Sequence, residues 1–282
     1  MIIDAHTHVW PRWPYQPPVP DDASRGSFEN LLHTMDANDV DKALIVSARI
    51  SRSEDNNDYG AAAVAAHPGR FVQIADIDGR WGPDYHTVGV VGRARELVER
   101  FHPVGLSHYL AQDNDGWLLS SEGTAFFEFA AAESLLVNFA APTIWMGDIR
   151  TVARHFPTVP ILINHLGVVG LHPGGLEDAM HLVLDHEALP NLLVKVSGYY
   201  YGSDRPWDYP YLDRLPVVRA FYDNWGPGRM IWASDWPSLL PHTSYRQSLE
   251  MLREHADYLS VQELDLVIGG TMAGLLEHRS PM

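Results

Sequence analysis

Two histidines separated by one residue stand near the start of the chain, in the stretch DAHTHVW at residues 4–10. Side chains on a β-strand alternate between its two faces, so a strand here would point His6 and His8 in the same direction. Two adjacent imidazoles at a strand end can bind a metal ion or polarise a carbonyl group. A pair of partly buried structural histidines has the same spacing, so the rest of the chain must decide between these interpretations.

Short runs rich in Leu, Ile and Val alternate with segments of helical period along the chain. We expect strands at residues 1–6, 42–48, 71–78, 103–110, 135–142, 159–167, 191–198 and 229–235, with helices between them. Nearly continuous apolar runs are typical of parallel strands that are buried on both faces. Eight such strands, each followed by a helix, in somewhat more than about 250 residues indicate a (β/α)8 TIM barrel. An open doubly wound sheet is the alternative, but no GxGxxG sequence follows the first strand.

We expect residues 1–282 to form a single domain, because no linker, repeat or low-complexity tract divides them. Residues after 260 are predicted to form an extra C-terminal helical segment on the outside of the barrel. The loop WPRWPYQPPVPDD at residues 10–22 is rich in proline and aromatic residues and follows the first strand. In a barrel it would lie at the face where active sites are found, either as a wall of the pocket or as a rigid surface loop.

The composition argues against several classes of function. A formal net charge of −16, from 36 Asp and Glu against 20 Lys and Arg, disfavours nucleic acid and anionic membrane surfaces as partners. The absence of cysteine excludes disulfides and thiolate chemistry. No apolar stretch approaches the roughly 20 residues that span a bilayer. The chain begins with an expected core strand rather than a signal peptide, so we expect a cytoplasmic protein with a small-molecule substrate; assembly into a homo-oligomer stays open.

Polar residues gather at the predicted carboxyl ends of the strands, which meet at one mouth in a barrel. His6 and His8 end the first strand, His165 follows the sixth and Asp235 ends the eighth. Taken singly, each could be structural, for example Asp235 as a helix cap. Their convergence on one end of the barrel favours a catalytic site. We expect a further set of strand-end side chains to bind the substrate: Trp10, Ser107, His108, Trp145, Lys195, Ser197, Tyr199 and Trp236.

Four short motifs, in this order, resemble the amidohydrolase superfamily: DAHTHVW, NHLG, KVSG and SDWP at the first, sixth, seventh and eighth strands. More narrowly, they resemble its amidohydrolase-related (amidohydrolase 2) group of sugar lactonases and 2-pyrone-4,6-dicarboxylate lactonases. The resemblance spans nearly the whole chain and implies a (β/α)8 barrel with hydrolytic chemistry. It implies that Asp235 is the general base that activates water. It also implies that His6, His8 and His165 either bind one divalent ion, with Zn²⁺ as the expected metal, or polarise the scissile carbonyl.

Two departures from the family pattern bear on the metal and on the substrate. Metal-dependent members generally supply a histidine or a carboxylated lysine from strand four or five, where this chain has GLSHYL and VNFAAPT. A metal held by the three histidines and Asp235, and a site that works without metal, therefore both stay open. The lactonase group usually has GxRH where residues 105–108 read GLSH. With Ser107 in place of arginine, the pocket should select anions less strongly or use another arginine, such as Arg49 or Arg52.

The sequence thus predicts a hydrolase that opens a lactone or similar cyclic ester of a sugar acid or small carboxylic acid with activated water. One alternative is a metal-dependent non-oxidative decarboxylase of an aromatic or enoic acid, a chemistry that the superfamily also performs. The other is a barrel that binds a small ligand without turning it over. A pure binding protein has little need of a general base, so Asp235 argues against that last alternative.

Overall fold

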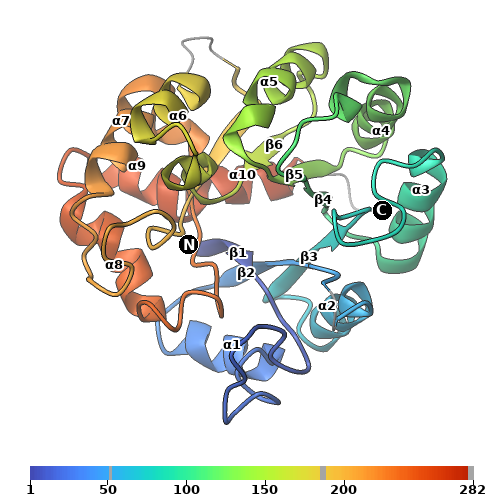
Figure 1. The fold of residues 1–282 in the computed structure, drawn as a ribbon. Coiled ribbons are helices and arrows are strands. Elements are labelled where there is room, and N and C mark those ends of the chain that lie inside the picture. Colours follow the sequence, from blue (N-terminus) through green and yellow to red (C-terminus); the bar gives the residue numbers. More distant parts are fainter. Residues whose placement is uncertain (51–52, 185–188, 279–282) are drawn as a thin grey trace.

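The eight expected strands are all present and form one parallel sheet, whose order follows the chain from β1 to β8. They are β1 (Ile3–Thr7), β2 (Lys42–Val46), β3 (Phe71–Asp76), β4 (Gly105–Tyr109), β5 (Leu136–Ala140), β6 (Ile161–Ile163), β7 (Leu192–Val196) and β8 (Met230–Trp232). The sheet closes because a bridge joins Thr7 of β1 to Trp236 beyond β8. The fold is therefore the predicted (β/α)8 TIM barrel (Figure 1). The computed structural model describes residues 1–50, 53–184 and 189–278.

Helices surround the barrel, one after each strand. They are α1 (Phe28–Asp36), α2 (Asn56–Ala66), α3 (Val90–Phe101), α4 (Ser121–Ala132), α5 (Met146–His155), α6 (Leu176–Val183), α7 (Leu215–Trp225) and α8 (Tyr245–His255). Short helical turns follow β4, β5 and β6, namely η1 (Trp117–Leu119), η2 (Thr143–Trp145) and η3 (His165–Leu171), and η4 (Pro227–Arg229) precedes β8. In the parts of the chain that the structure describes, we find no helix that is long and apolar enough to cross a membrane.

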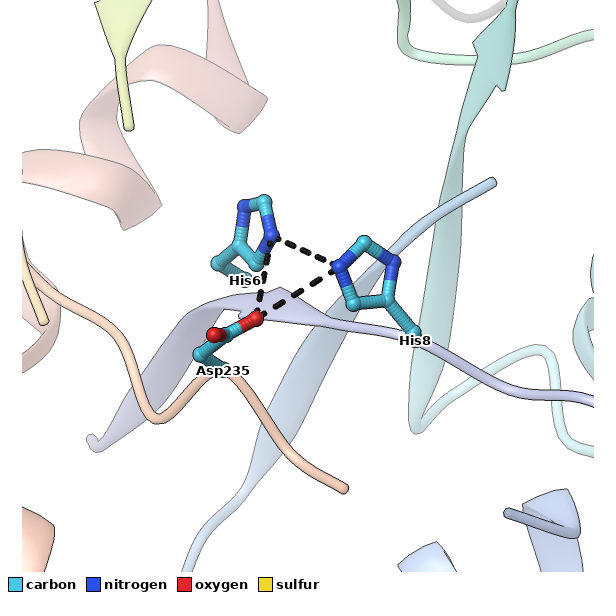
Figure 2. Close-up of side chains that lie close together, drawn as sticks. All are labelled: His6, His8 and Asp235. Carbon is cyan, nitrogen blue, oxygen red and sulfur yellow. Dashed lines mark hydrogen bonds and ion pairs between the residues drawn. The ribbon is translucent and has the colours of Figure 1, made fainter. Parts of the chain in front are cut away.

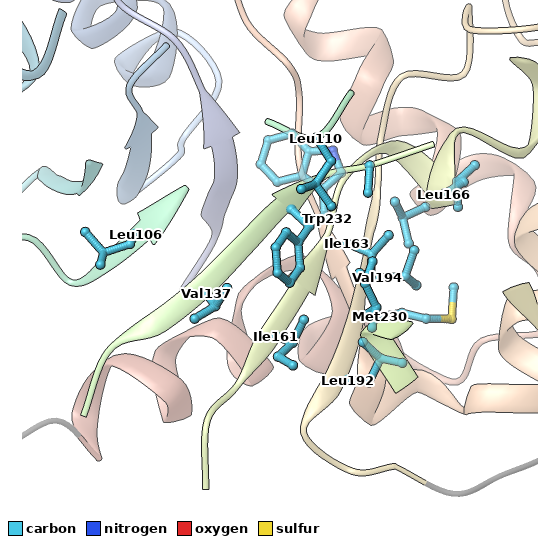
Figure 3. Close-up of a cluster of buried hydrophobic side chains, with 14 of the residues drawn as sticks. Leu106, Leu110, Val137, Ile161, Ile163, Leu166, Leu192, Val194, Met230 and Trp232 are labelled. Atoms are coloured by element: carbon cyan, nitrogen blue, oxygen red, sulfur yellow. The ribbon is translucent and has the colours of Figure 1, made fainter. Parts of the chain in front are cut away.

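Successive strand residues contribute to two different layers of the core. On β7, Leu192 and Val194 belong to the apolar layer between strands and helices, part of which Figure 3 shows. Leu193, between them, belongs to the apolar cluster inside the barrel. Lys195 has the same parity as Leu193 and is also fully buried. The barrel interior is therefore lined by apolar side chains toward the amino ends of the strands and by polar side chains toward the carboxyl ends.

The C-terminal segment is helical, as predicted, but lies elsewhere than expected. It comprises α9 (Val261–Asp265), the short π-helix η5 (Leu266–Gly270) and α10 (Thr271–Glu277). Met272 is fully buried in the cluster inside the barrel, together with Ile3 and Leu136. Gly269 packs so closely on the backbone of Met1 that a Cβ there would lie 2.3 Å from the Met1 carbonyl oxygen. The segment therefore closes the amino-terminal end of the barrel instead of packing outside the ring of helices.

The sixth strand is shorter than predicted. The expectation of a strand over residues 159–167 was wrong at its carboxyl end, because β6 ends at Ile163. From His165 to Val168 the backbone has φ angles of 52°, 53°, 66° and 45°, in the left-handed region. A strand cannot continue through that conformation. The turn instead places His165 at the mouth of the barrel and the buried Leu166 in the layer beneath the helices.

Candidate active site

Three side chains from two neighbouring segments meet at the carboxyl end of the barrel (Figure 2). The His6 and His8 Nε2 atoms lie 3.1 Å apart, and Asp235 Oδ1 lies 3.6 Å from the first and 3.5 Å from the second. His165 approaches from the β6 side, with its Nε2 atom 3.9 Å from the same carboxylate oxygen. The four side chains therefore lie together at one end of the barrel, and the roles expected for them stay predictions.

An irregularity in β1 directs both histidines into the site. The pairing register between β1 and β2 shifts between Asp4 and Thr7. Ala5 belongs to the apolar cluster inside the barrel, yet the next residue, His6, also reaches inward to contact Lys195. Simple alternation would send one of these two side chains outward. A bulge that re-aims a side chain is a common device beside active sites.

The buried carboxylate of Asp4 fixes the junction between β1 and the end of β8. Its Oδ1 atom accepts hydrogen bonds from the backbone N–H of His6 (3.1 Å) and of Ser234 (2.9 Å), and its Oδ2 atom accepts one from Tyr245 Oη (2.8 Å). The backbone of Asp235 then donates to the carbonyl of His6 at 2.9 Å. The Asp4 side chain therefore holds the two segments that carry His6 and Asp235 in register.

Two hydrogen bonds orient the ring nitrogens of His8 and His165. His8 Nδ1 lies 2.6 Å from the carbonyl oxygen of Val46, and His165 Nδ1 lies 2.9 Å from Ser197 Oγ. A carbonyl oxygen can only accept, so His8 carries its proton on Nδ1 when neutral. Its Nε2 lone pair then faces Asp235 and His6. This outer hydrogen bond is the arrangement usual for a metal-ligating histidine.

Lys195 lies beneath His6, fully buried. Its Nζ atom is 3.0 Å from His6 Nδ1 and 2.5 Å from Asn138 Oδ1. Burial lowers the pKa of Lys195 to about 7, although Asp4 and Asp235 act in the opposite direction. As an ammonium, Lys195 donates to Nδ1 and leaves the His6 proton on Nε2, facing the pocket; as an amine, it can accept from Nδ1 and leave the Nε2 lone pair free.

The carboxylate of Asp235 is ionised although it is buried. Burial alone would raise its pKa, but His165, His8 and Tyr200 lower the pKa to about 2. The hydroxyls of Tyr200 and Tyr201 donate to Oδ2 at 2.5 and 3.0 Å, which leaves Oδ1 for the histidines and the pocket. Burial lowers the pKa of His165 to about 4. At neutral pH the site therefore combines a carboxylate with neutral imidazole, a set suited to proton transfer and to metal binding.

A cavity of about 230 Å³, which we call the central pocket, opens above these groups. The four catalytic candidates His6, His8, His165 and Asp235 line it together with Tyr15, Arg80, Tyr109, Gln112, Val168, Leu171 and Tyr201. Tyr15 lies in the aromatic loop at residues 10–22, so that loop forms part of the pocket wall. The volume accommodates a small molecule at the catalytic side chains.

The eight side chains that the sequence assigned to substrate binding are all buried, and none of them lines the central pocket: Trp10, Ser107, His108, Trp145, Lys195, Ser197, Tyr199 and Trp236. Several instead contact the catalytic groups from behind. Trp10 stacks on His8, with ring centroids 5.0 Å apart, while Lys195 and Ser197 bond His6 and His165. As direct substrate contacts these eight residues stay predictions; in this structure Trp10, Lys195 and Ser197 contact the candidate catalytic side chains instead.

Three polar side chains at the site were not among the predicted site residues: Tyr200, Tyr201 and Arg80. Tyr200 and Tyr201 bind Asp235, whereas the predicted Tyr199 stacks on Tyr211, with ring centroids 6.2 Å apart. Arg80 is the only Arg or Lys that lines the central pocket, and no carboxylate pairs with it in the described parts of the chain. It follows β3 directly, so the strand-end rule that identified His165 could have identified Arg80 as well.

Of the two arginines proposed from the sequence, only Arg49 lies in a described part of the chain. Arg49 donates through Nε to the carbonyl of Glu54 at 3.1 Å and does not line the central pocket. Arg52 lies outside the described residues. Ser107, where the lactonase group that the sequence resembles usually has arginine, is buried and accepts a hydrogen bond from Asn138 Nδ2 at 2.9 Å. Among the described residues that line the central pocket, Arg80 is the one that can make a charged contact to an anionic substrate.

His108 anchors the loop after β3. Its Nδ1 atom is 2.7 Å from the carbonyl oxygen of Ile77, and its Nε2 atom is 3.0 Å from His86 Nε2. His86 in turn contacts Asp115, with Nδ1 2.6 Å from Oδ2. Because this chain of contacts joins the loop that carries Arg80 to the end of β4, it fixes one wall of the pocket.

Replacing His108 with glutamine should reduce the acid sensitivity of the fold. Burial lowers the pKa of His108 to about 4, against about 6.5 in an unfolded chain. Between these values the unfolded chain binds a proton that the folded protein excludes. The part of the unfolding free energy that depends on neutral His108 is therefore fully present above pH 6.5 and declines as the pH falls toward 4. We expect the variant to lose about 2–3 kcal/mol less unfolding free energy than the wild type between pH 7 and 4.5. Urea unfolding at both pH values measures it, with the exposed His155→Gln as control; equal losses in His108→Gln and the wild type would contradict it.

The Amidohydrolase family model matches residues 3–273 of the chain. An L-fucono-1,5-lactonase from Burkholderia ambifaria is 25% identical over 244 residues, which cover 83% of this chain and 80% of that protein. A 4-sulfomuconolactone hydrolase from Hydrogenophaga intermedia is 33% identical over 88 residues, covering 31% of this chain and 27% of that protein.

Solved structures show the same fold at low sequence identity. An amidohydrolase from Burkholderia multivorans with bound zinc has a TM-score of 0.77 at 19% identity, over 98% of this chain and 99% of that one. A probable 2-pyrone-4,6-dicarboxylic acid hydrolase from Acinetobacter baumannii, with citric acid bound, has a TM-score of 0.75 at 19% identity and the same coverage. These likenesses establish the arrangement of the barrel.

Proposed function

The chain belongs to the amidohydrolase family, and we propose that it hydrolyses a lactone or similar cyclic ester of a sugar acid or small carboxylic acid. The observation that carries this proposal is the ionised carboxylate of Asp235 beside three imidazoles at the floor of a small pocket. The relative named as a lactonase, similar over most of its length, supports the substrate class. We also propose that residues 1–282 are one amidohydrolase-like domain, since the family match spans the barrel without a break.

In the proposed reaction, water attacks the ring carbonyl carbon while Asp235 Oδ1 accepts a proton from that water. Charge develops on the carbonyl oxygen, which His165 and the β1 histidines stabilise. When the ring C–O bond breaks, the departing alkoxide takes the proton from Asp235, and the product is a hydroxy acid. Tyr200 and Tyr201 hold the other carboxylate oxygen, so Oδ1 faces the pocket throughout.

The donor set also fits one divalent metal ion. The ligand atoms of His6, His8 and Asp235 lie within 4.8 Å of one another, all three residues are buried, and the His8 Nε2 lone pair faces the cluster. Two imidazoles and a carboxylate are ligands that Zn²⁺ accepts in catalytic sites. When bound, such an ion supplies Lewis-acid stabilisation of charge at the carbonyl oxygen. We propose that these three residues hold it, while His165 stays free for substrate.

Lys195→Gln should increase the affinity of this site for Zn²⁺ at least tenfold. The ammonium of Lys195 places the His6 proton on Nε2, the atom that must bind the metal, and adds a positive charge beneath the site. Glutamine can accept from His6 Nδ1 and donate to Asn138 without that charge. Calorimetric titration of the metal-free protein with Zn²⁺ measures the change. Lys42→Gln, at the only other lysine, is the control; an unchanged or weaker affinity in Lys195→Gln would contradict the hydrogen-bond assignment.

The proposed function is tested by a panel of five- and six-membered lactones, assayed by proton release before and after chelation. Ring opening that survives chelation would assign carbonyl polarisation to the histidines. Ring opening that is lost on chelation and restored by Zn²⁺ would assign carbonyl polarisation to the metal. Failure to open any lactone, together with carbon dioxide release from aromatic acids, would replace the proposal with the decarboxylase alternative.

A further inference from the structure

A second cavity adjoins the central pocket. This side pocket, of about 190 Å³, lies between η2 and η3 at the carboxyl ends of β5 and β6. Gln112, Pro142, Val168 and Leu171 line both cavities. The two cavities therefore adjoin at these four residues.

The lining of the side pocket is mainly hydrocarbon. Ile144, which lines only this cavity, is 54% exposed, and Leu171 is 58% exposed. No Asp, Glu, Lys or Arg is among the described residues that line it. Of its three polar side chains, Thr143 and His172 satisfy each other, since Thr143 Oγ1 lies 2.6 Å from His172 Nδ1, and the third is Gln112. Such a surface favours an apolar group over water or an ion.

The backbone at Val168 adds an independent observation. Val168 has φ 45° and ψ 32°, a left-handed conformation that costs a residue with a Cβ about 1–2 kcal/mol and that glycine adopts freely. A β-branched residue there is a pronounced outlier. Backbone strain of this kind clusters at active sites and ligand-binding sites. Val168 lines both cavities, so a substituent that passes from one to the other would contact this residue.

We propose that the side pocket is a substrate subsite that binds an apolar substituent, an alkyl chain of several carbons, carried by the lactone ring. This inference rests on the proposed function and specifies its substrate. The ring carbonyl lies at Asp235, and the chain passes Val168 to reach Ile144 and Leu171. One methylene in an apolar pocket changes kcat/KM by roughly 10-fold or more, so the alkyl chain should dominate selectivity.

The test compares δ-valerolactone with the same ring carrying a pentyl chain on the carbon next to the ring oxygen. We expect the wild type to prefer the pentyl lactone at least tenfold in kcat/KM. In Ile144→Asn and in Leu171→Asn this preference should fall at least fivefold, mainly through KM. Val261→Asn, an exposed β-branched residue on α9, should keep the preference. Equal kcat/KM for the two lactones in the wild type, or a preference that both variants retain, would overturn the subsite.

Binding separates this inference from the proposed function. The matching pair of lactams, with and without the pentyl chain, is titrated into the wild type and into Ile144→Asn by calorimetry. If the wild type binds the pentyl lactam more tightly than the unsubstituted lactam and Ile144→Asn does not, the subsite is supported even if no lactone is hydrolysed. Absence of hydrolysis would then reject only the proposed reaction. Equal binding, or no binding, of the two lactams would overturn the subsite, whether or not lactones are opened.

Discussion

Asp235→Asn is expected to lower kcat for lactone hydrolysis about 1000-fold without unfolding the barrel. Asparagine matches the carboxylate in shape, and its carbonyl oxygen can still accept from Tyr200 and Tyr201. Its amide nitrogen cannot accept a proton from water, and it faces the histidines as a donor where Oδ1 was an acceptor. Because the pKa of Asp235 lies at about 2, the wild-type carboxylate is available at any pH at which the assay is run.

Steady-state kinetics on the best lactone of the panel measure this loss, and thermal unfolding shows whether the fold is intact. Asp223→Asn is a matched control, since Asp223 is an exposed carboxylate on α7 that pairs with Arg219. It should leave kcat unchanged. A folded Asp235→Asn variant that retains a tenth or more of wild-type kcat would show that another group is the base.

The barrel and the identity of its central residues could be predicted because both follow from periodicity. Apolar runs located the eight strands, and the carboxyl ends of parallel strands must meet, which brought His6, His8 and Asp235 together before any coordinates. Periodicity does not predict the direction of a side chain at positions where the strand or helix geometry is irregular or ends. Ala5 and His6 both face inward because of a register shift, which no composition rule signals.

The same reason explains why the expected substrate contacts lie behind the pocket. Lys195 is a strand residue that points into the barrel, and such positions are buried beneath the loops. The upper walls come largely from loop residues such as Tyr15, Arg80 and Leu171, whose directions depend on local turns. Beyond β7 the alternation also ends, so Tyr200 and Tyr201 reach Asp235 while Tyr199 does not. The positions of residues at strand ends could therefore be predicted from the sequence better than those of residues on loops.

His165→Ala is expected to reduce kcat about 100- to 1000-fold, the usual loss when one group that stabilises an oxyanion is removed. Neutral imidazole at this position follows from burial, which lowers the pKa of His165 to about 4. The left-handed turn over residues 165–168 aims the ring at the pocket, and Ser197 fixes its Nδ1 side. Ser197→Ala should therefore produce a smaller loss in the same direction, because it frees the ring without removing it.

Metal content distinguishes a chemical role of His165 from a ligand role. His165 Nε2 lies 3.9 Å from Asp235 Oδ1, and the compact ligand set consists of His6, His8 and Asp235 without it. We therefore expect His165→Ala to bind Zn²⁺ with wild-type stoichiometry in calorimetric titration, whereas His8→Ala should lose that binding. Added imidazole should restore part of the His165→Ala activity, since the ring's space is left empty. Loss of Zn²⁺ binding in His165→Ala would instead make His165 a fourth ligand, and leave the β1 histidines and Asp235 to perform the chemistry.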